Sequence, residues 1–125
     1  MYGNGADVDF WTGANRLDGY LGWWDSGWFG SYYKSDNGWW YHVELGWIYP
    51  SGSAGGGLWI WKEGLNWVWT NESVYPFLYS HERGSWYYLY GELGQKRLLY
   101  DYGLREWKHL DDRGVDESRG EEIER

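Results

Sequence analysis

The stretch Leu58-Trp59-Ile60-Trp61-Lys62-Glu63-Gly64-Leu65-Asn66-Trp67-Val68-Trp69-Thr70 decides the fold of this chain. Its two ends are rich in aromatic and β-branched residues, which favour strands. Its middle, residues 63–66, has the composition of a turn. The stretch therefore predicts one β-hairpin. Both faces of the first predicted strand, residues 58–61, are apolar, so we expect both faces to be covered.

Similar segments recur along the chain at nearly constant intervals, which is typical of a repeat architecture. The repeats are anchored on a tryptophan near each predicted turn, and successive anchors are 19, 20, 19 and 21 residues apart: Trp28, Trp47, Trp67, Trp86 and Trp107. Glycine-rich or polar joints are expected at residues 34–38, 50–57, 71–74 and 91–96. We therefore predict an all-β protein, an antiparallel meander of about five hairpin repeats of ~20 residues. A solenoid, a small closed barrel or sandwich, and a self-associating sheet would each cover both faces.

The charge distribution divides the chain into three parts. Residues 1–19 are interpreted as an irregular lead-in with one strand near residues 8–11, and residues 20–110 as the aromatic repeat domain. Residues 111–125 hold seven acidic and three basic residues and no aromatic residue. Because this segment has almost nothing to bury, we expect an acidic flexible tail there.

Composition excludes several classes of protein. The 13 Trp, 13 Tyr and 3 Phe make 29 aromatic residues, against only 20 Leu, Ile and Val, so the body of the chain is not disordered. A net charge of −8 argues against nucleic acid as a partner, because phosphates require a basic surface. The apolar runs are too short for a transmembrane helix. The first residues do not resemble a signal peptide, so we expect either a cytosolic protein or a mature domain or excised piece of a secreted one.

The order of the aromatic segments resembles a known type of module. The runs Trp40-Tyr41-His42, Gly46-Trp47-Ile48-Tyr49, Trp67-Val68-Trp69-Thr70, Tyr75-Pro76-Phe77-Leu78-Tyr79 and Gly84-Ser85-Trp86-Tyr87-Tyr88 are similar to a Trp/Tyr-rich module. That uncharacterised module is found at the C-terminal ends of large secreted proteins of marine and environmental bacteria. The resemblance covers about residues 20–110. It implies an accessory domain of a larger protein, located outside the cell or at its surface.

A looser similarity is to the choline-binding and glucan-binding hairpin repeats of cell-wall proteins. The run Gly84-Ser85-Trp86-Tyr87-Tyr88-Leu89, followed by Gly91 and Gly94, resembles the core of those repeats. In that family, aromatic residues of neighbouring hairpins hold choline through cation–π contacts. The resemblance implies that Trp86 and Tyr88 are cage residues, with Trp67 or Trp47 from neighbouring repeats.

The polar residues do not form a recognisable catalytic or metal-binding pattern. His42 and His81 occupy one position of the repeat, two repeats apart, and are expected to be hydrogen-bonded side chains without a metal. The acidic residues lie near predicted turns, where solubilising charge is common: Asp25, Glu44, Glu63, Glu82, Asp101 and Glu106. The short, regular hairpins offer no cleft for a catalytic carboxylate pair. We therefore expect no enzyme, no catalytic residue, no cofactor and no bound metal.

The aromatic surplus carries the functional expectation. Aromatic residues on both strand faces exceed what a thin repeat fold can bury, and exposed aromatic faces bind sugar rings and cationic groups. We expect a non-catalytic module that binds polysaccharide or another cell-surface polymer, without membrane insertion. The candidate ligand-binding residues are Trp39, Trp59, Trp61, Trp69, Trp86 and Tyr88. The alternative is a structural element whose aromatic faces stack between subunits in a homo-oligomer.

Overall fold

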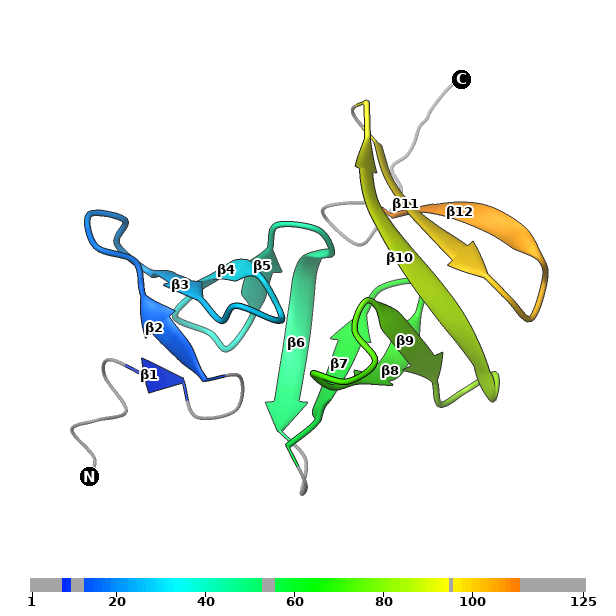
Figure 1. The fold of residues 1–125 in the computed structure, drawn as a ribbon, viewed down its shortest axis with the longest axis horizontal. Helices are drawn as coiled ribbons and strands as arrows, with labels where there is room; N and C mark the ends of the chain where they lie inside the picture. Colours follow the sequence, from blue (N-terminus) through cyan, green and yellow to red (C-terminus); the bar gives the residue numbers. More distant parts are fainter. Residues whose placement is uncertain (1–7, 10–12, 53–55, 95, 111–125) are drawn as a thin grey trace.

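The computed structural model describes residues 8–9, 13–52, 56–94 and 96–110, and every regular element in them is a strand (Figure 1). The twelve strands are β1 (Val8–Asp9), β2 (Ala14–Arg16), β3 (Trp23–Asp25), β4 (Ser31–Lys34), β5 (Trp40–His42), β6 (Gly46–Gly52), β7 (Leu58–Lys62), β8 (Asn66–Thr70), β9 (Phe77–Ser80), β10 (Ser85–Leu93), β11 (Lys96–Asp101) and β12 (Glu106–Leu110). Each strand pairs antiparallel with the next one in sequence. The predicted all-β antiparallel meander is confirmed.

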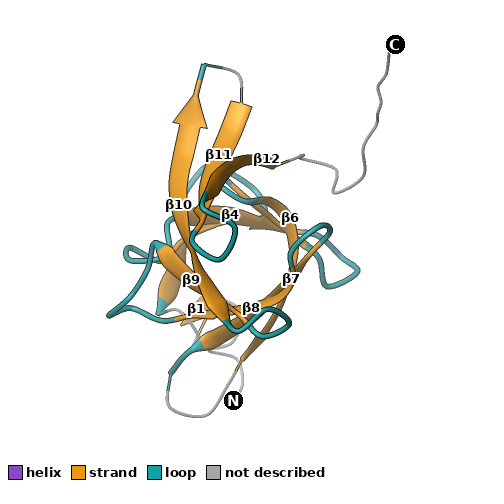
Figure 2. Cartoon of the chain, turned by 90° about the vertical axis from the view of Figure 1, so that its right-hand side faces the viewer, coloured by secondary structure: helices purple, strands orange, loops and turns teal. Residues whose placement is uncertain are grey.

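The sheet coils without closing. In Figure 2 the strands β6 to β10 follow one another around a ring, and β1 and β12 are the two edges of the described sheet. Side chains far apart in sequence meet across this coil. The Arg97 guanidinium donates to the Tyr41 hydroxyl at 2.7 Å, and the Tyr75 hydroxyl donates to the Glu44 carboxylate at 2.8 Å. Among the arrangements open from the sequence, the chain therefore adopts a single coiled open sheet and not a barrel.

The core lies on the inner face of the coil and is mainly aliphatic along its central strands. Inward positions alternate with outward ones, as the two-residue period of a strand requires. The fully buried aliphatic residues of β6 to β11 are Ile48, Leu58, Ile60, Val68, Leu78, Leu89 and Leu99. Tyr87 adds one buried ring on β10. At the N-terminal end the core is mainly aromatic, and Tyr32 and Trp40 stack there with their ring centroids 4.1 Å apart.

Five turns share one construction, and together they define the repeat. Each spans five residues and ends on a residue with positive φ: 26–30, 42–46, 62–66, 80–84 and 101–105. In four of them the first side chain accepts a hydrogen bond from the backbone N–H of the fourth residue. The acceptors are Ser26 Oγ, His42 Nδ1, Ser80 Oγ and Asp101 Oδ1, at 2.8 to 3.2 Å. Because this bond is made within the turn, each hairpin can form locally.

The remaining turn, residues 62–66, begins with a lysine, which has no acceptor atom. There the Leu65 N–H bonds the Lys62 carbonyl at 2.9 Å instead. The buried Lys62 ammonium donates to the Trp47 carbonyl on the neighbouring hairpin at 3.4 Å. This side chain therefore links two repeats.

Asp101 forms two ion pairs from its turn position: its buried carboxylate lies 3.2 Å from Lys108 Nζ and 3.7 Å from an Arg83 nitrogen. Burial alone would raise the pKa of Asp101, but the Leu104 hydrogen bond and the two cations outweigh it and lower this pKa below its ordinary value. The carboxylate therefore stabilises the fold above that ordinary value, and the contribution is lost as the pH falls through the lowered one.

We expect Asp101→Asn to lower the free energy of unfolding at pH 7 by about 1 to 2 kcal/mol, because both cations lose their buried partner while staying partly solvated. Urea unfolding followed by tryptophan fluorescence measures this change. The difference from the wild type should begin to shrink below pH 3.8, where the carboxyl of the unfolded chain takes up a proton, and should disappear once the pH falls through the lowered pKa of the folded protein. Equal stability of the two proteins at pH 7 would contradict the expectation.

Several boundaries predicted from the sequence are corrected. Trp28 is not equivalent to the other anchors: it lies in the turn between β3 and β4, and its ring packs on Tyr75. The expected joint at residues 50–57 is shorter, because β6 continues to Gly52 and Pro50 pairs with Ile60. Within the expected joint at 91–96, Gly91 is part of β10 at a register shift. The segment described as a lead-in contains β1 and β2, and the predicted tail, residues 111–125, lies outside the described residues.

Candidate functional site

The outer face of the sheet carries four rows of four aromatic residues that run across the strands. Within a row, neighbouring residues oppose each other on adjacent strands. The first row is Trp23, Tyr33, Tyr41 and Trp47. The second is Trp39, Tyr49, Trp61 and Trp67. The third is Trp59, Trp69, Tyr79 and Trp86. The fourth is Phe77, Tyr88, Tyr100 and Trp107.

Each row advances by one hairpin relative to the row before it. A typical hairpin contributes one aromatic pair near its turn and one pair two residues farther away, such as Trp61–Trp67 and Trp59–Trp69 in β7 and β8. The near pair ends one row and the far pair begins the next. The rows therefore follow the coil of the sheet as a continuous aromatic band.

All six residues predicted as ligand-binding lie in this band. Trp39 and Trp61 belong to the second row, Trp59, Trp69 and Trp86 to the third, and Tyr88 to the fourth. The structure brings five of them into two adjacent rows and places Tyr88 one row farther along. The tyrosines between them, Tyr49 and Tyr79, were not predicted, although an aromatic-x-aromatic spacing lies on both sides of the turns 42–46, 62–66 and 80–84 and identifies them.

The rings of the band are half-buried or exposed, and they hold one another edge-on. The ring centroids of the Trp39–Tyr49, Tyr41–Trp47 and Tyr79–Trp86 pairs are 5.2 to 5.4 Å apart, and the ring planes are inclined by 66° to 73°. Edge-to-face pairs of this kind stabilise a sheet through cross-strand contact. They also leave faces of some rings open to solvent, which is what a stacking surface needs.

Small residues make room beneath the rings. A Cβ on Gly57 would lie 2.5 Å from the indole nitrogen of Trp69, and one on Gly22 would lie 2.5 Å from the Tyr33 ring. Both glycines come just before a strand whose first aromatic residue begins a row. Close approach of ring and backbone therefore requires glycine at these two places.

A shallow pocket opens in the band where the second and third rows meet. It has a volume of about 270 Å³ and is lined by Ser51, Trp59, Trp67 and His81. The Trp59 and His81 rings stand nearly perpendicular, at 88°, with centroids 5.9 Å apart. His81 is placed opposite Trp67, since its N–H donates to the Trp67 carbonyl. The pocket thus combines two indole walls with one hydroxyl and one imidazole.

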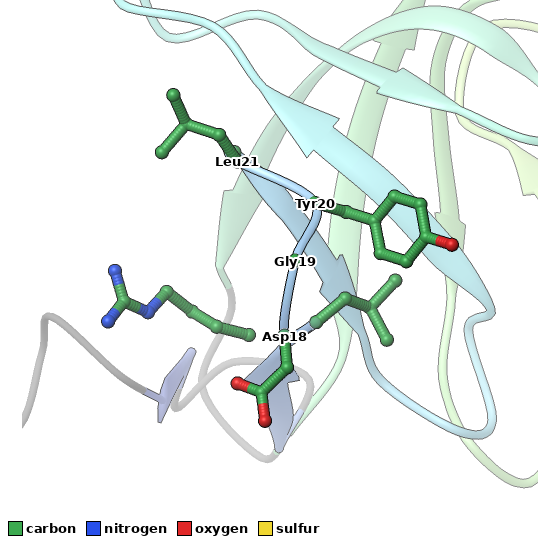
Figure 3. Close-up of a pocket in the computed structure, with 7 residues that line it drawn as sticks. Asp18, Gly19, Tyr20 and Leu21 are labelled. Atoms are coloured by element: carbon green, nitrogen blue, oxygen red, sulfur yellow. The ribbon is translucent and has the colours of Figure 1, made fainter.

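A second hollow, with a volume of about 310 Å³, is lined by residues 16–22, the end of β2 and the loop that leads to β3. Figure 3 shows the Tyr20 and Leu21 side chains pointing away from each other at its rim. Their exposed fractions are 66% and 94%, among the largest for apolar residues in the described chain. All of its lining residues come from this single segment.

The polar residues considered as catalytic or metal-binding candidates make structural contacts. His42 is fully buried: its Nε2 bonds the Phe29 carbonyl, and its Nδ1 accepts from the N–H groups of Glu44 and Leu45. Glu82 accepts from Asn66 Nδ2 at 2.6 Å. Within the described ranges, no group of three or more His, Cys, Asp or Glu residues is placed to hold a metal ion.

The chain matches no protein-family model, no curated protein and no solved structure. None of the described residues forms a helix that is long and apolar enough to cross a membrane. The aromatic band is therefore characterised by its own geometry and chemistry.

Proposed function

We propose that this domain is a non-catalytic module that binds polysaccharide, or a similar cell-surface polymer, through the outer aromatic band. The observation that carries the proposal is the alignment of four aromatic rows on one solvent-facing surface. A purely structural sheet would gain more by burying these rings, because exposed aromatic area contributes little to folding. Large contiguous exposed aromatic surfaces usually mark a binding site.

The chemistry of the band favours sugar over other polymers. The C–H faces of sugar rings stack on indole and phenol rings, and their hydroxyls bond to nearby polar groups. The net charge of −8 opposes nucleic acids and other polyanions. Rows of rings that cross several strands suit an extended polymer ligand, since each of its repeated sugar units can make the same contact with a ring of the band.

Binding should be measured on a panel of insoluble and soluble polysaccharides by pull-down and affinity electrophoresis. We expect binding to at least one glycan, and a loss of about tenfold or more in affinity for the double variant Trp61→Ala/Trp86→Ala, since each stacking contact is worth about 1 kcal/mol. Leu104→Ala is the control: this residue is exposed in a turn outside the band, so its substitution should leave the affinity unchanged. No binding to any polysaccharide, by a folded wild-type protein, would refute the proposal.

The alternative of self-association rests on the edge of the sheet. Trp107, which is 53% exposed, lies on the edge strand β12, and Tyr102 and Leu104 are exposed in the adjoining turn. An unpaired edge with apolar neighbours can pair with a second copy. Sedimentation velocity at high micromolar concentration tests this: concentration-dependent oligomers that vanish in Trp107→Lys would support it, and a monomer throughout would remove it.

A further inference from the structure

We infer that the pocket between the second and third aromatic rows is the principal subsite of the module, and that it holds one ring of an uncharged polysaccharide chain at an internal position. This inference rests on the proposed function. It goes further by assigning one site, its hydrogen-bonding partners and the charge class of the ligand.

The geometry singles out this pocket from the rest of the band. Trp59 and Trp67 lie diagonally across β7 and β8, because Trp59 pairs with Trp69 and Trp61 pairs with Trp67. His81 stands edge-on to Trp59 from the next turn, and Ser51 opposes Trp59 from β6. Four segments thus converge on a hollow of about 270 Å³, below the usual volume of a drug-sized site and suited to one sugar ring.

The lining of the pocket is mostly apolar, and Ser51 and His81 supply its few polar atoms. The exposed Ser51 hydroxyl can donate and accept hydrogen bonds, and the ring nitrogens of His81 can also form hydrogen bonds. A sugar ring needs this combination, with apolar faces above and below and hydroxyl groups around its edge.

Two observations favour an uncharged ligand. Glu82 follows His81 directly, and its carboxylate accepts a hydrogen bond from Asn66, which precedes Trp67. A carboxylate therefore lies next to two residues that line the pocket. The chain as a whole is also acidic, with a net charge of −8. A carboxylated or sulfated sugar would therefore be repelled at the pocket and by the whole domain.

The pocket is open along the band, which favours an internal unit of a chain over a chain end. On one side the second row continues through Trp61 and Tyr49, and on the other the third row continues through Trp69 and Tyr79. Neighbouring strands are ~4.8 Å apart, similar to the length of one ring in an extended polysaccharide. Successive sugar rings can therefore meet successive strands.

The test compares hydroxyethyl cellulose, which is uncharged, with carboxymethyl cellulose, which has the same backbone and is anionic. In affinity electrophoresis and calorimetry, the wild type should bind the uncharged polymer at least about tenfold more tightly than the anionic one. This difference in affinity should become smaller in high salt, which screens the repulsion. Stronger binding to the anionic polymer would overturn the assignment of charge class. An uncharged β-1,3-glucan and a mannan complete the panel in case the backbone linkage matters.

Matched variants locate the subsite. Trp67→Ala should weaken binding by about tenfold or more, whereas Trp107→Ala, at the equivalent position of the last hairpin, should weaken it by about twofold, since only the first forms the pocket. His81→Ala changes an exposed turn residue and should reduce affinity about threefold without unfolding the domain. Thermal unfolding of each variant separates lost binding from lost structure.

The outcomes distinguish this inference from the function on which it rests. If the wild type binds none of these polysaccharides, the proposed function fails together with the subsite. If the wild type binds but Trp67→Ala and Trp107→Ala lose affinity equally, or His81→Ala loses none, binding is spread along the band and only the subsite is refuted.

Discussion

Tyr75→Ala is expected to lower the free energy of unfolding by about 3 kcal/mol, the largest single effect that we anticipate for one side chain outside the aliphatic core. The Tyr75 ring packs edge-on against Trp28 and Phe29, with centroids 5.9 and 5.5 Å away, and also contacts His42. These partners belong to two other hairpins. Removing the ring therefore opens a cavity exactly where the coil is held together across distant segments.

The hydroxyl of Tyr75 provides the control. Burial and the neighbouring Glu44 carboxylate both raise the pKa of Tyr75, so the phenol stays protonated and donates to Glu44. Tyr75→Phe keeps the ring and should cost only about 1 kcal/mol, the usual value of one hydrogen bond. Chemical denaturation gives both values. If Tyr75→Phe were as damaging as Tyr75→Ala, the hydrogen bond and not the ring packing would hold these hairpins together.

Acidification from pH 6.5 to pH 4 is expected to remove about 3 kcal/mol of stability through His42 alone. Burial lowers the pKa of His42 from 6.5 to about 4; the hydrogen bond to Phe29 opposes this shift, and the charge of Arg97 adds to it. The folded protein keeps the imidazole neutral, while the unfolded chain takes up a proton near pH 6.5. Stability from this group is therefore complete above pH 6.5 and declines as the pH falls toward 4.

The His42→Ser variant isolates this effect, because serine occupies the same turn position at residues 26 and 80 and accepts the same hydrogen bond there. We expect the variant to be less stable than the wild type at pH 7.5, since it loses ring packing. Its stability should nevertheless change less between pH 6.5 and 4. Denaturant unfolding across this pH range measures both slopes, and His109→Gln, at an exposed position, should keep the wild-type slope. If the free energy of unfolding fell equally steeply with pH in His42→Ser and in the wild type, His42 would not be the source of the acid sensitivity.

The hairpins could be predicted because the interactions that form them are local. In residues 58–70 the strand residues, the turn composition and the spacing between Trp61 and Trp67 all lie within one short stretch. The same local pattern placed the anchors Trp47, Trp67, Trp86 and Trp107 correctly at the start of their second strands. The prediction of Trp28 as an anchor was wrong. Each true anchor opposes the residue that precedes its turn, and in the first hairpin that place, opposite Asp25, is occupied by Ser31. The packing of Trp28 on Tyr75 joins segments 47 residues apart, which no local pattern reveals.

The candidate site was predictable in part. The sequence identified Trp59 and Trp69 as candidates from composition, but the register of β7 against β8 was needed to show that they oppose each other. His81 was considered only as a metal ligand or hydrogen-bonding group. Its place beside Trp59 depends on how the turn after β9 meets β7, which are separated by β8. Contacts across an intervening strand leave no periodic signal in the sequence.

Consecutive antiparallel hairpins with a repeated turn follow from the amino-acid order alone, because strand preference and turn chemistry act over a few residues. That order does not determine which face of each strand is buried, since residues such as Ile60 and Trp61 are both apolar. Only the tertiary structure decided that Ile60 points inward and Trp61 outward. The physical reason is curvature: the inside of a tightly coiled sheet offers less room per residue than the outside. Compact aliphatic side chains therefore fill the interior of the central strands, and the large rings form the outer band.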